Sequence, residues 1–187
     1  MDLIEIANSG LIKAGGNVIM SLTDDSREGR LANNRFKSDM RTVLRWHPWN
    51  CAMARVELSP LVTTPAFGYS QQFQMPSDLL RLSLIEDVED FRIEGRLILC
   101  DESTIDIKYV KDPGEAVAEL DQLCTEAIAT YFAWDICYAL VQSNSLRASL
   151  WVSFMDIFRH AKSVDSKEDM MSQITANEWD DSRSAGA

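Results

Sequence analysis

The sequence predicts an α+β fold that is mainly α: a four-helix bundle-like domain, an antiparallel β-rich insertion between helices two and three, and an extended C-terminal tail. Apolar residues recur at helical spacing before residue 48 and again after residue 113. Prolines and alternating β-branched residues fill the stretch between, and the last residues are polar and acidic. We therefore expect a helical bundle domain over 1–48 and 111–163, a β-rich insertion over 49–110, and a flexible tail over 164–187.

The first helix is predicted over residues 2–14. Its apolar positions form one stripe at helical spacing, made of Ile4, Ala7, Leu11 and Ala14. A glycine pair at 15–16 follows directly, and glycine is common just after a helix because it adopts a left-handed backbone without strain. The helix should therefore end at this pair.

A second helix is predicted from near Ser26 to just before Pro48. Asp25 followed by Glu28 has the form of an N-terminal cap backed by a returning carboxylate. One face is apolar and the outer face is basic, so the helix is amphipathic. The basic residues are Arg27, Arg30, Arg35, Lys37 and Arg41. Such a face is either solvated or a contact for an acidic partner surface.

The segment Trp46-His47-Pro48-Trp49 is the most distinctive in the chain. Proline removes a backbone N–H and pushes residue 47 toward extended geometry, so the chain must turn here. Two indoles at the turn supply a large apolar area whose N–H groups need partners. We expect a structural corner with at least one indole buried between the second helix and the sheet, and with His47 as a packed or capping imidazole.

Short strands are predicted over 52–58, 70–74, 80–85, 91–94, 96–100 and 104–110. In the last of these, Ile105, Ile107 and Tyr109 share one face. We expect a small antiparallel sheet that the flanking helices cover, because short strands are not stable without a cover. Residues 63–69 should form an exposed loop.

Two long helices are predicted after the insertion. Pro113 suits a helix first turn, and the stripe that follows should reach Gln142. A break at 143–145 precedes the next helix, and so short a link predicts antiparallel packing. Aromatic residues line both helices; they are core residues, or in part an interface if one subunit cannot bury them all. They are Tyr131, Trp134, Tyr138, Trp151, Phe154 and Phe158.

Composition bounds the function. The 187 residues include 29 acidic and 18 basic side chains, a net charge of −11. Lys and Arg clusters supply the affinity for nucleic-acid phosphates and anionic lipid, so we expect attractive binding to neither. No apolar window approaches the roughly 18 residues of a membrane span, and the acidic start lacks the basic region of a signal peptide. We expect a protein made in the host cytoplasm, with no membrane partner.

The sequence has no known catalytic or metal-binding motif. It contains no glycine-rich phosphate loop, nucleophile elbow, HExxH or paired CxxC motif. The cysteines are far apart, which favours free thiols over disulfides or zinc. The acidic run at 86–90 lacks the glycine and the alternating oxygen ligands of calcium loops and is typical of a solvated turn. We expect no enzyme, no cofactor and no metal site.

Several short motifs, taken in their order along the chain, resemble one family. The main ones are Val43-Leu44-Arg45-x-His47-Pro48-Trp49-Asn50-Cys51-Ala52, Pro65-x-Phe67-Gly68-Tyr69, Phe73-x-Met75-Pro76-x-Asp78-Leu79-Leu80-Arg81 and Glu94-Gly95-Arg96-x-Ile98-Leu99. Over roughly residues 1–160 the chain resembles the tail tubular protein A family of tailed phages, the head-to-tail adaptor below the portal. The resemblance implies a virion neck protein without catalytic activity. It also implies a dodecamer, a ring of about twelve copies that joins the portal to the tail nozzle.

The resemblance also implies roles for particular residues. Phe67 and Tyr69 would lie in a loop that faces the nozzle, a tail tubular protein B-like partner. Trp179 and Arg183 would belong to a portal-binding tail, because Glu178-Trp179-x-x-Ser182-Arg183 is similar to tail ends in this family. The basic face of the second helix would be a subunit or portal contact. Genomic DNA would pass through the ring without specific binding, and tail fibres are a further candidate partner.

Two alternatives stay open at this point. The protein could be a neck completion or stopper protein that closes the channel itself, because sequence does not separate an adaptor from a stopper. The less favoured alternative is a small cytosolic enzyme in which His47 and nearby carboxylates act as acid and base.

Overall fold

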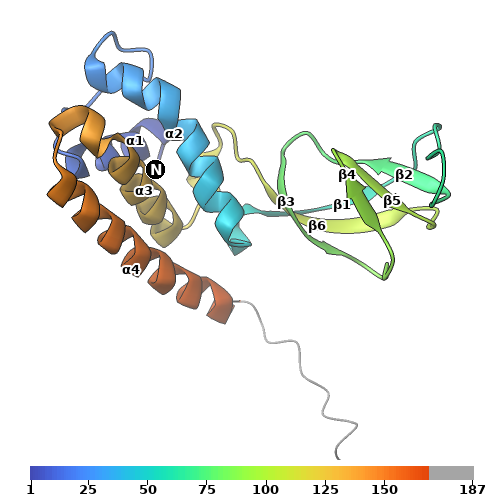
Figure 1. The fold of residues 1–187 in the computed structure, drawn as a ribbon. Helices are drawn as coiled ribbons and strands as arrows, with labels where there is room; N and C mark the ends of the chain where they lie inside the picture. Colours follow the sequence, from blue (N-terminus) through green and yellow to red (C-terminus); the bar gives the residue numbers. More distant parts are fainter. Residues whose placement is uncertain (169–187) are drawn as a thin grey trace, which may run out of the picture.

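The computed structural model describes residues 1–168 and has helices at one end of an elongated molecule and strands at the other (Figure 1). The predicted combination of helices with an antiparallel β region is confirmed. The helices are α1 (Leu3–Lys13), α2 (Arg27–Trp46), α3 (Gln122–Val141) and α4 (Asn144–Glu168), with short 3-10 turns at Asn50–Ala52 and Val117–Glu119. The strands are β1 (Met53–Leu58), β2 (Gln71–Gln74), β3 (Leu79–Ile85), β4 (Arg92–Glu94), β5 (Leu97–Cys100) and β6 (Ile105–Lys111).

Helix α1 begins and ends where its sequence predicts. The Asp2 carboxylate accepts a hydrogen bond of 2.7 Å from the Glu5 backbone N–H, and the Glu5 carboxylate accepts one of 2.7 Å from the Asp2 N–H. This reciprocal pair caps the first turn. Gly15 follows the helix with a φ of +80°, the left-handed geometry expected at the glycine pair.

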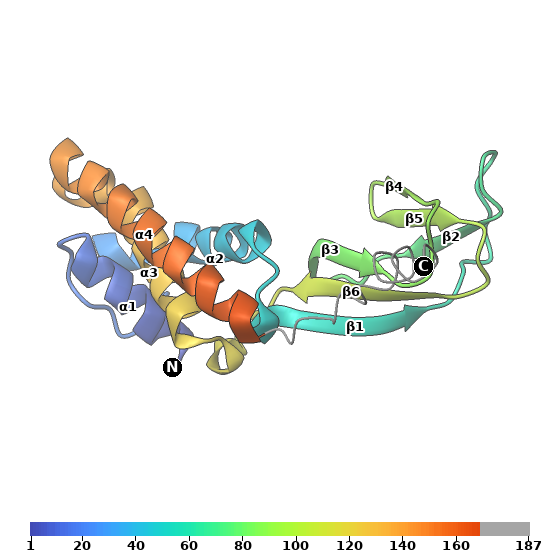
Figure 2. The same cartoon turned by 90° about the horizontal axis from the view of Figure 1, so that it is seen from below.

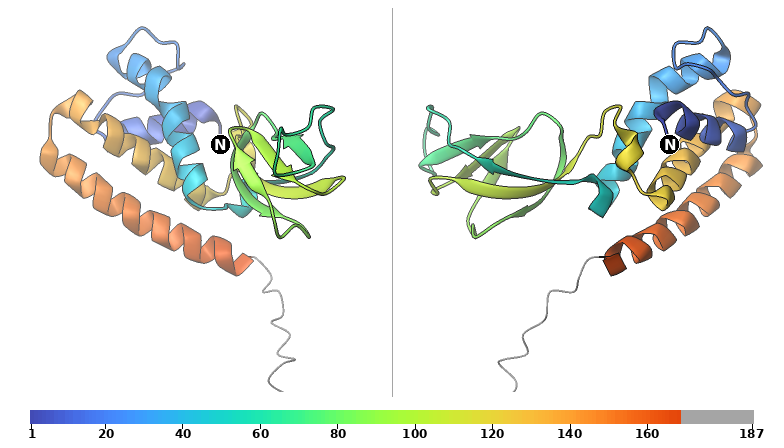
Figure 3. Two further views of the ribbon diagram at one scale, coloured as in Figure 1. Left: turned by 45° about the vertical axis from the view of Figure 1, so that its right-hand side comes forward. Right: turned by 180° about the vertical axis from the view of Figure 1, so that it is seen from behind.

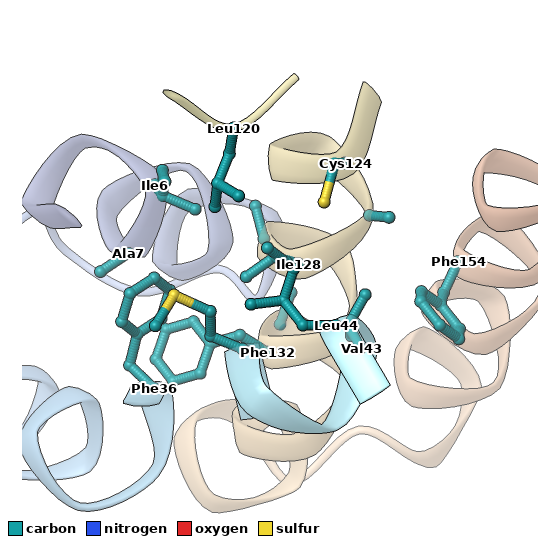
Figure 4. Close-up of a cluster of buried hydrophobic side chains, with 14 of the residues drawn as sticks. Ile6, Ala7, Phe36, Val43, Leu44, Leu120, Cys124, Ile128, Phe132 and Phe154 are labelled. Carbon is teal, nitrogen blue, oxygen red and sulfur yellow. The ribbon is translucent and has the colours of Figure 1, made fainter. Parts of the chain in front are cut away.

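Helix α1 approaches α3 closely at Gly10. A Cβ at Gly10 would lie 2.6 Å from Phe132 Cδ1 and 2.7 Å from the Ala129 carbonyl oxygen, so a larger residue would push the helices apart. Phe132 also meets Phe36 of α2 edge to face, with ring centroids 5.2 Å apart. In Figure 4, side chains of α1, α2 and α4 surround those of α3, so α3 is the central helix of this region.

The N-cap of α2 is Ser26 and not Asp25, so that prediction is wrong by one residue. The Ser26 hydroxyl accepts a 2.9 Å hydrogen bond from the Gly29 N–H. This bond satisfies one of the backbone N–H groups that have no partner in the first turn of the helix. Glu28 does not return to the cap, because its carboxylate accepts from the Asn17 side chain at 3.0 Å. The helix stops at Trp46, before Pro48, as expected.

The strands form two three-stranded antiparallel sheets, in the orders β1-β6-β3 and β2-β5-β4. Phe73 of β2 lies opposite Ile98 of β5, and both join Ile107 and Tyr109 of β6 in a hydrophobic cluster between the sheets. The prediction of a single sheet covered by helices is therefore wrong. Each sheet covers the other, and the β region projects away from the helices (Figure 2). Alternation indicates a buried face but does not say which strands pair.

Pro113 does not open a helix, contrary to the prediction. Gly114 has a φ of +60°, and its N–H donates to the Asp112 carboxylate at 3.0 Å, so the chain turns here instead. Helix α3 begins eight residues later than Gly114, at Gln122, where the Asp121 carboxylate accepts from the Leu123 N–H at 3.0 Å. It ends at Val141, and Gln142 adopts a left-handed backbone.

Helix α4 runs antiparallel to α3, as predicted from the short link, and the views of Figure 3 agree on this arrangement. Helix α4 continues to Glu168, so the prediction that a tail begins at residue 164 is wrong. Asp165 is only 9% exposed and packs against the body of the protein. Residues 169–187, which include Trp179 and Arg183, lie outside the described residues.

Candidate functional site

The corner after α2 is built around Trp49. Only 1% of Trp49 is exposed, and its indole N–H donates to the Val43 carbonyl at 3.2 Å. The indole lies 4.9 Å from the His47 ring and 5.8 Å from the Phe158 ring of α4, measured between centroids. The buried indole thus contacts α4, whereas the sequence placed it between α2 and the sheet. Pro48 forces this turn, because residue 47 is extended with φ −135° and ψ 145°.

His47 and Asp165 join the corner to the last turns of α4. A hydrogen bond of 2.9 Å links His47 Nε2 to Asp165 Oδ2, and both residues are buried. The Asn50 backbone N–H donates to Asp165 Oδ1 at 2.9 Å, and the Asn50 side-chain amide donates to the Asp165 carbonyl at 2.7 Å. We call this group the corner latch: His47, Asn50 and Asp165. It fixes where α4 ends relative to the corner.

Sequence reasoning missed the latch because it assigned Asp165 to the tail. The signal was nevertheless present: Asp165 follows Phe158 and Ala161 at helical spacing, and both of these are buried. A carboxylate in an apolar stripe needs buried partners, and the corner supplies them.

Aromatic rings on α2, α3 and α4 form a continuous contact series that is partly exposed. Trp46 is 42% exposed, and its ring lies 5.4 Å from that of Tyr131. Trp134 and Trp151 lie 4.9 Å apart, and the Arg147 guanidinium lies 4.9 Å from the Trp134 ring. The exposed members of this series are Trp46 and Trp151, and together with the exposed side chains of Tyr138, Val141 and Val152 on α3 and α4 we call them the aromatic face.

Four of the five residues in the basic strip of α2 pair with a carboxylate of the described chain. Arg30 Nη1 lies 2.5 Å from Asp25 Oδ1, Arg35 Nε 2.7 Å from Asp135 Oδ2, Lys37 Nζ 3.3 Å from Glu115 Oε1, and Arg41 Nε 2.6 Å from Asp112 Oδ2. Arg27 donates to the carbonyls of Ala139 and Leu140 at the end of α3. The charge of the strip is therefore largely compensated, which leaves less charge for a partner surface than the sequence indicated.

Asp39 is a buried carboxylate that sequence reasoning also missed. It is 2% exposed, and its Oδ1 lies 3.4 Å from Arg35 Nη2, while Oδ2 has no partner among the described residues. Burial first, and then the Asp135 carboxylate, raise the pKa of Asp39, while Arg35 lowers it; the net result is a pKa of about 7. The position three residues after Phe36, in the apolar stripe of α2, was the available signal.

The loop between β1 and β2 lies at the end of the molecule remote from the helices (Figure 1). Phe67 in this loop is 88% exposed, and Val62 in the same loop is also exposed. Tyr69 is held, because its hydroxyl donates to Asp90 at 2.9 Å. The Gln72 side chain donates to the Thr63 carbonyl at 2.8 Å, so the loop is braced at its base. We call residues 61–72, of which the last two begin β2, the distal loop.

The described part of the chain contains no group of three or more His, Cys, Asp or Glu side chains that could hold a metal ion. In residues 1–168, no helix is both long and apolar enough to cross a membrane. No protein-family model matches the chain, and no curated protein matches it. Any assignment of function consequently depends on the geometry and on the resemblance of the sequence motifs.

Proposed function

We propose that the chain is a structural head-to-tail adaptor subunit of a tailed phage. In this proposal copies of the chain form a ring, of about twelve by resemblance, between portal and tail nozzle, and the packaged DNA passes through it. The chain acts as a connector in the virion neck and catalyses no reaction.

The observation that carries the proposal is the separation of two exposed apolar surfaces. The aromatic face lies on the helices, and the distal loop with Phe67 lies at the far end of the β region. A ring built by rotation needs two different complementary patches on each subunit, and a connector needs a further contact along the axis. An elongated molecule with exposed apolar side chains on its helices and in a loop remote from them meets these needs better than a molecule with one pocket.

We propose that the helices form a bundle-like wall, in which α3 lies centrally and α4 carries much of the exposed aromatic face. Permanent ring interfaces bury on the order of 2,000 Å² or more, and exposed tryptophans are typical of their centres. Trp151, which is 36% exposed, and Val152, which is 60% exposed, are the best candidates for a subunit contact. The compensated strip on α2 contributes polar rim contacts in this arrangement.

The chemistry of His47 supports a structural role over the enzyme alternative. Both members of the His47–Asp165 pair are buried, at 8% and 9% exposure. The second carboxylate oxygen of Asp165 accepts a hydrogen bond from the Asn50 N–H. A general acid or base must reach its substrate, whereas this pair reaches only the corner.

Electron microscopy of the purified chain mixed with its portal tests the proposal. We expect rings on the portal for the natural sequence, and no rings for a variant carrying Trp151→Ser and Val152→Ser, because the subunit contact is weakened. A matched variant, Phe67→Ser, should form the ring but should fail to recruit the nozzle protein. A natural chain that binds the portal as single copies, or not at all, would refute the adaptor function.

A further inference from the structure

A hollow of about 290 Å³ lies between the end of α2, the start of β3 and the β4–β5 turn. Arg45, Arg81 and Arg96 come from these three elements and all line it. Ile93 and Leu82 add apolar surface, and Ile93 is 47% exposed. We call this the arginine pocket. Its volume is near the lower limit for ligand sites in proteins.

The three guanidinium groups are held in place by backbone carbonyls. Arg45 donates to the Leu80 carbonyl, and Arg96 to the Pro76 carbonyl. Arg81 donates to the carbonyls of Arg45 and Trp46, both at 3.4 Å, where the end of α2 attracts a cation. Each of these bonds uses one nitrogen of a group that can donate five N–H bonds. The remaining donors are therefore free to bind a ligand in a fixed geometry.

The charge in the pocket is uncompensated within the part of the chain that the structure describes. No carboxylate of residues 1–168 lies within ion-pair distance of Arg45, Arg81 or Arg96, whereas Arg30, Arg35, Lys37 and Arg41 on α2 each have one. Three guanidinium groups without a carboxylate partner therefore surround one hollow, in a chain whose net charge is −11. Guanidinium groups bind carboxylates in a bidentate geometry, so the pocket favours a ligand with several carboxylates.

The strand at the pocket favours a peptide as that ligand. Strand β4 is the outer strand in the order β2-β5-β4, so one of its edges is not paired with another described strand. Ile93, on this strand, lines the pocket. An open strand edge binds an extended peptide through its main chain, and a neighbouring apolar hollow accepts a large side chain. An acidic peptide with an aromatic residue therefore fits the chemistry of the pocket.

We propose that the arginine pocket binds the acidic segment Glu178-Trp179-Asp180-Asp181 of the same chain. The segment supplies three carboxylates for three guanidinium groups, and Trp179 supplies the apolar group. The corner latch fixes the end of α4 beside His47, two residues after Arg45. From Glu168 to Glu178 the chain spans up to about 33 Å when extended. The proposal concerns the free chain and stands whether or not the chain is an adaptor.

Fluorine NMR of the full chain labelled with 5-fluorotryptophan tests this binding. The Trp179 resonance is assigned with Trp179→Phe and compared with that of a free peptide covering residues 174–187. In the natural chain we expect the Trp179 resonance to be shifted from the peptide position, and to move toward it as salt is raised, because screening weakens the ion pairs. The triple variant Arg45→Gln, Arg81→Gln and Arg96→Gln should give the peptide position.

Two further variants test the acidic segment itself and the effect of removing the same charge outside the pocket. Glu178→Gln, Asp180→Asn and Asp181→Asn together leave the pocket intact and should also give the peptide position. The control Arg55→Gln, Arg92→Gln and Lys108→Gln removes the same charge outside the pocket and should leave the resonance shifted. A natural chain whose Trp179 resonance coincides with the peptide's would overturn the proposal. A shift that disappears on dilution would also overturn it, because the segment would then bind to a second copy.

Discussion

The hydrophobic clusters of the helical and β regions are assembled from different parts of the chain. The helical cluster joins residues far apart in the chain: Phe36 meets Phe132, and Arg35 pairs with Asp135 across an interval of 100 residues. The β cluster is built entirely from one continuous segment of the chain, between Met53 and Lys111. The difference indicates that the β region is a closed insertion, whereas the helical region forms only when both ends of the chain come together.

The joint between the two regions is narrow. Val110, near the end of β6, belongs to the helical cluster, and Leu80 of β3 packs against that cluster. Arg45 of α2 donates to the Leu80 carbonyl. We therefore expect damage to one region to spread to the other only through this joint, and the following predictions test that expectation.

The largest effect should come from Trp49→Ala. The variant removes a side chain that is 99% buried together with its hydrogen bond to Val43, so we expect a loss of about 3–5 kcal/mol in the free energy of unfolding. The matched variant Trp46→Ala removes a ring that is 42% exposed and should cost less than about 2 kcal/mol. Denaturant titrations followed by circular dichroism measure both; equal losses would show that the corner is not organised around Trp49.

A somewhat smaller and local effect is expected from Phe73→Ala. Phe73 is fully buried in the β cluster, but that cluster is small and can partly collapse, so we expect a loss of about 3 kcal/mol. Hydrogen exchange should show lost protection in β2 and β5 with unchanged protection in α3. Equal loss of protection in α3 would mean that the two regions unfold as one unit.

The same contrast explains how much of the fold could be predicted from the sequence. Helix α1 and the end of α2 follow from local chemistry, because Asp2, Gly15 and Pro48 act within one turn. The pairing of β5 with β2 could not be predicted, because it depends on contacts across the chain that alternation leaves open. No helix starts at Pro113, because Gly114 has a positive φ and turns the chain there. Composition alone does not reveal that backbone conformation.

The candidate site was predicted only in part, for a similar reason. The motif at 46–49 identified the corner because its chemistry is local. Asp165 completes the corner from 115 residues away, and the arginine pocket combines residues from α2, β3 and the β4–β5 turn. Sites assembled from separate elements need the tertiary structure to become visible.

A pH-dependent effect of about 1–3 kcal/mol is expected from Asp39→Asn. Because the pKa of Asp39 is raised to about 7, the folded state binds a proton that the unfolded state releases between about pH 4 and pH 7. This group therefore lowers stability as pH rises through that range. The asparagine variant should be more stable than the natural chain at pH 8, and this advantage should shrink toward pH 4. Denaturant titrations at both values measure the difference; an advantage that grows in acid would show that the carboxylate is stabilised by Arg35.

The smallest effect should come from Arg41→Gln, which tests the polar side of the joint. Arg41 of α2 pairs with Asp112, the first residue after β6, at 2.6 Å, but its side chain is 52% exposed. Exposed ion pairs contribute about 0.2–1 kcal/mol and weaken with salt, so we expect a loss in this range that disappears at high ionic strength. The control Arg30→Gln breaks a pair whose two side chains are 62% and 97% exposed and should cost less still. A loss above 2 kcal/mol for Arg41→Gln, unaffected by salt, would mean that this pair fixes the β region to the helices and that the joint is not mainly apolar.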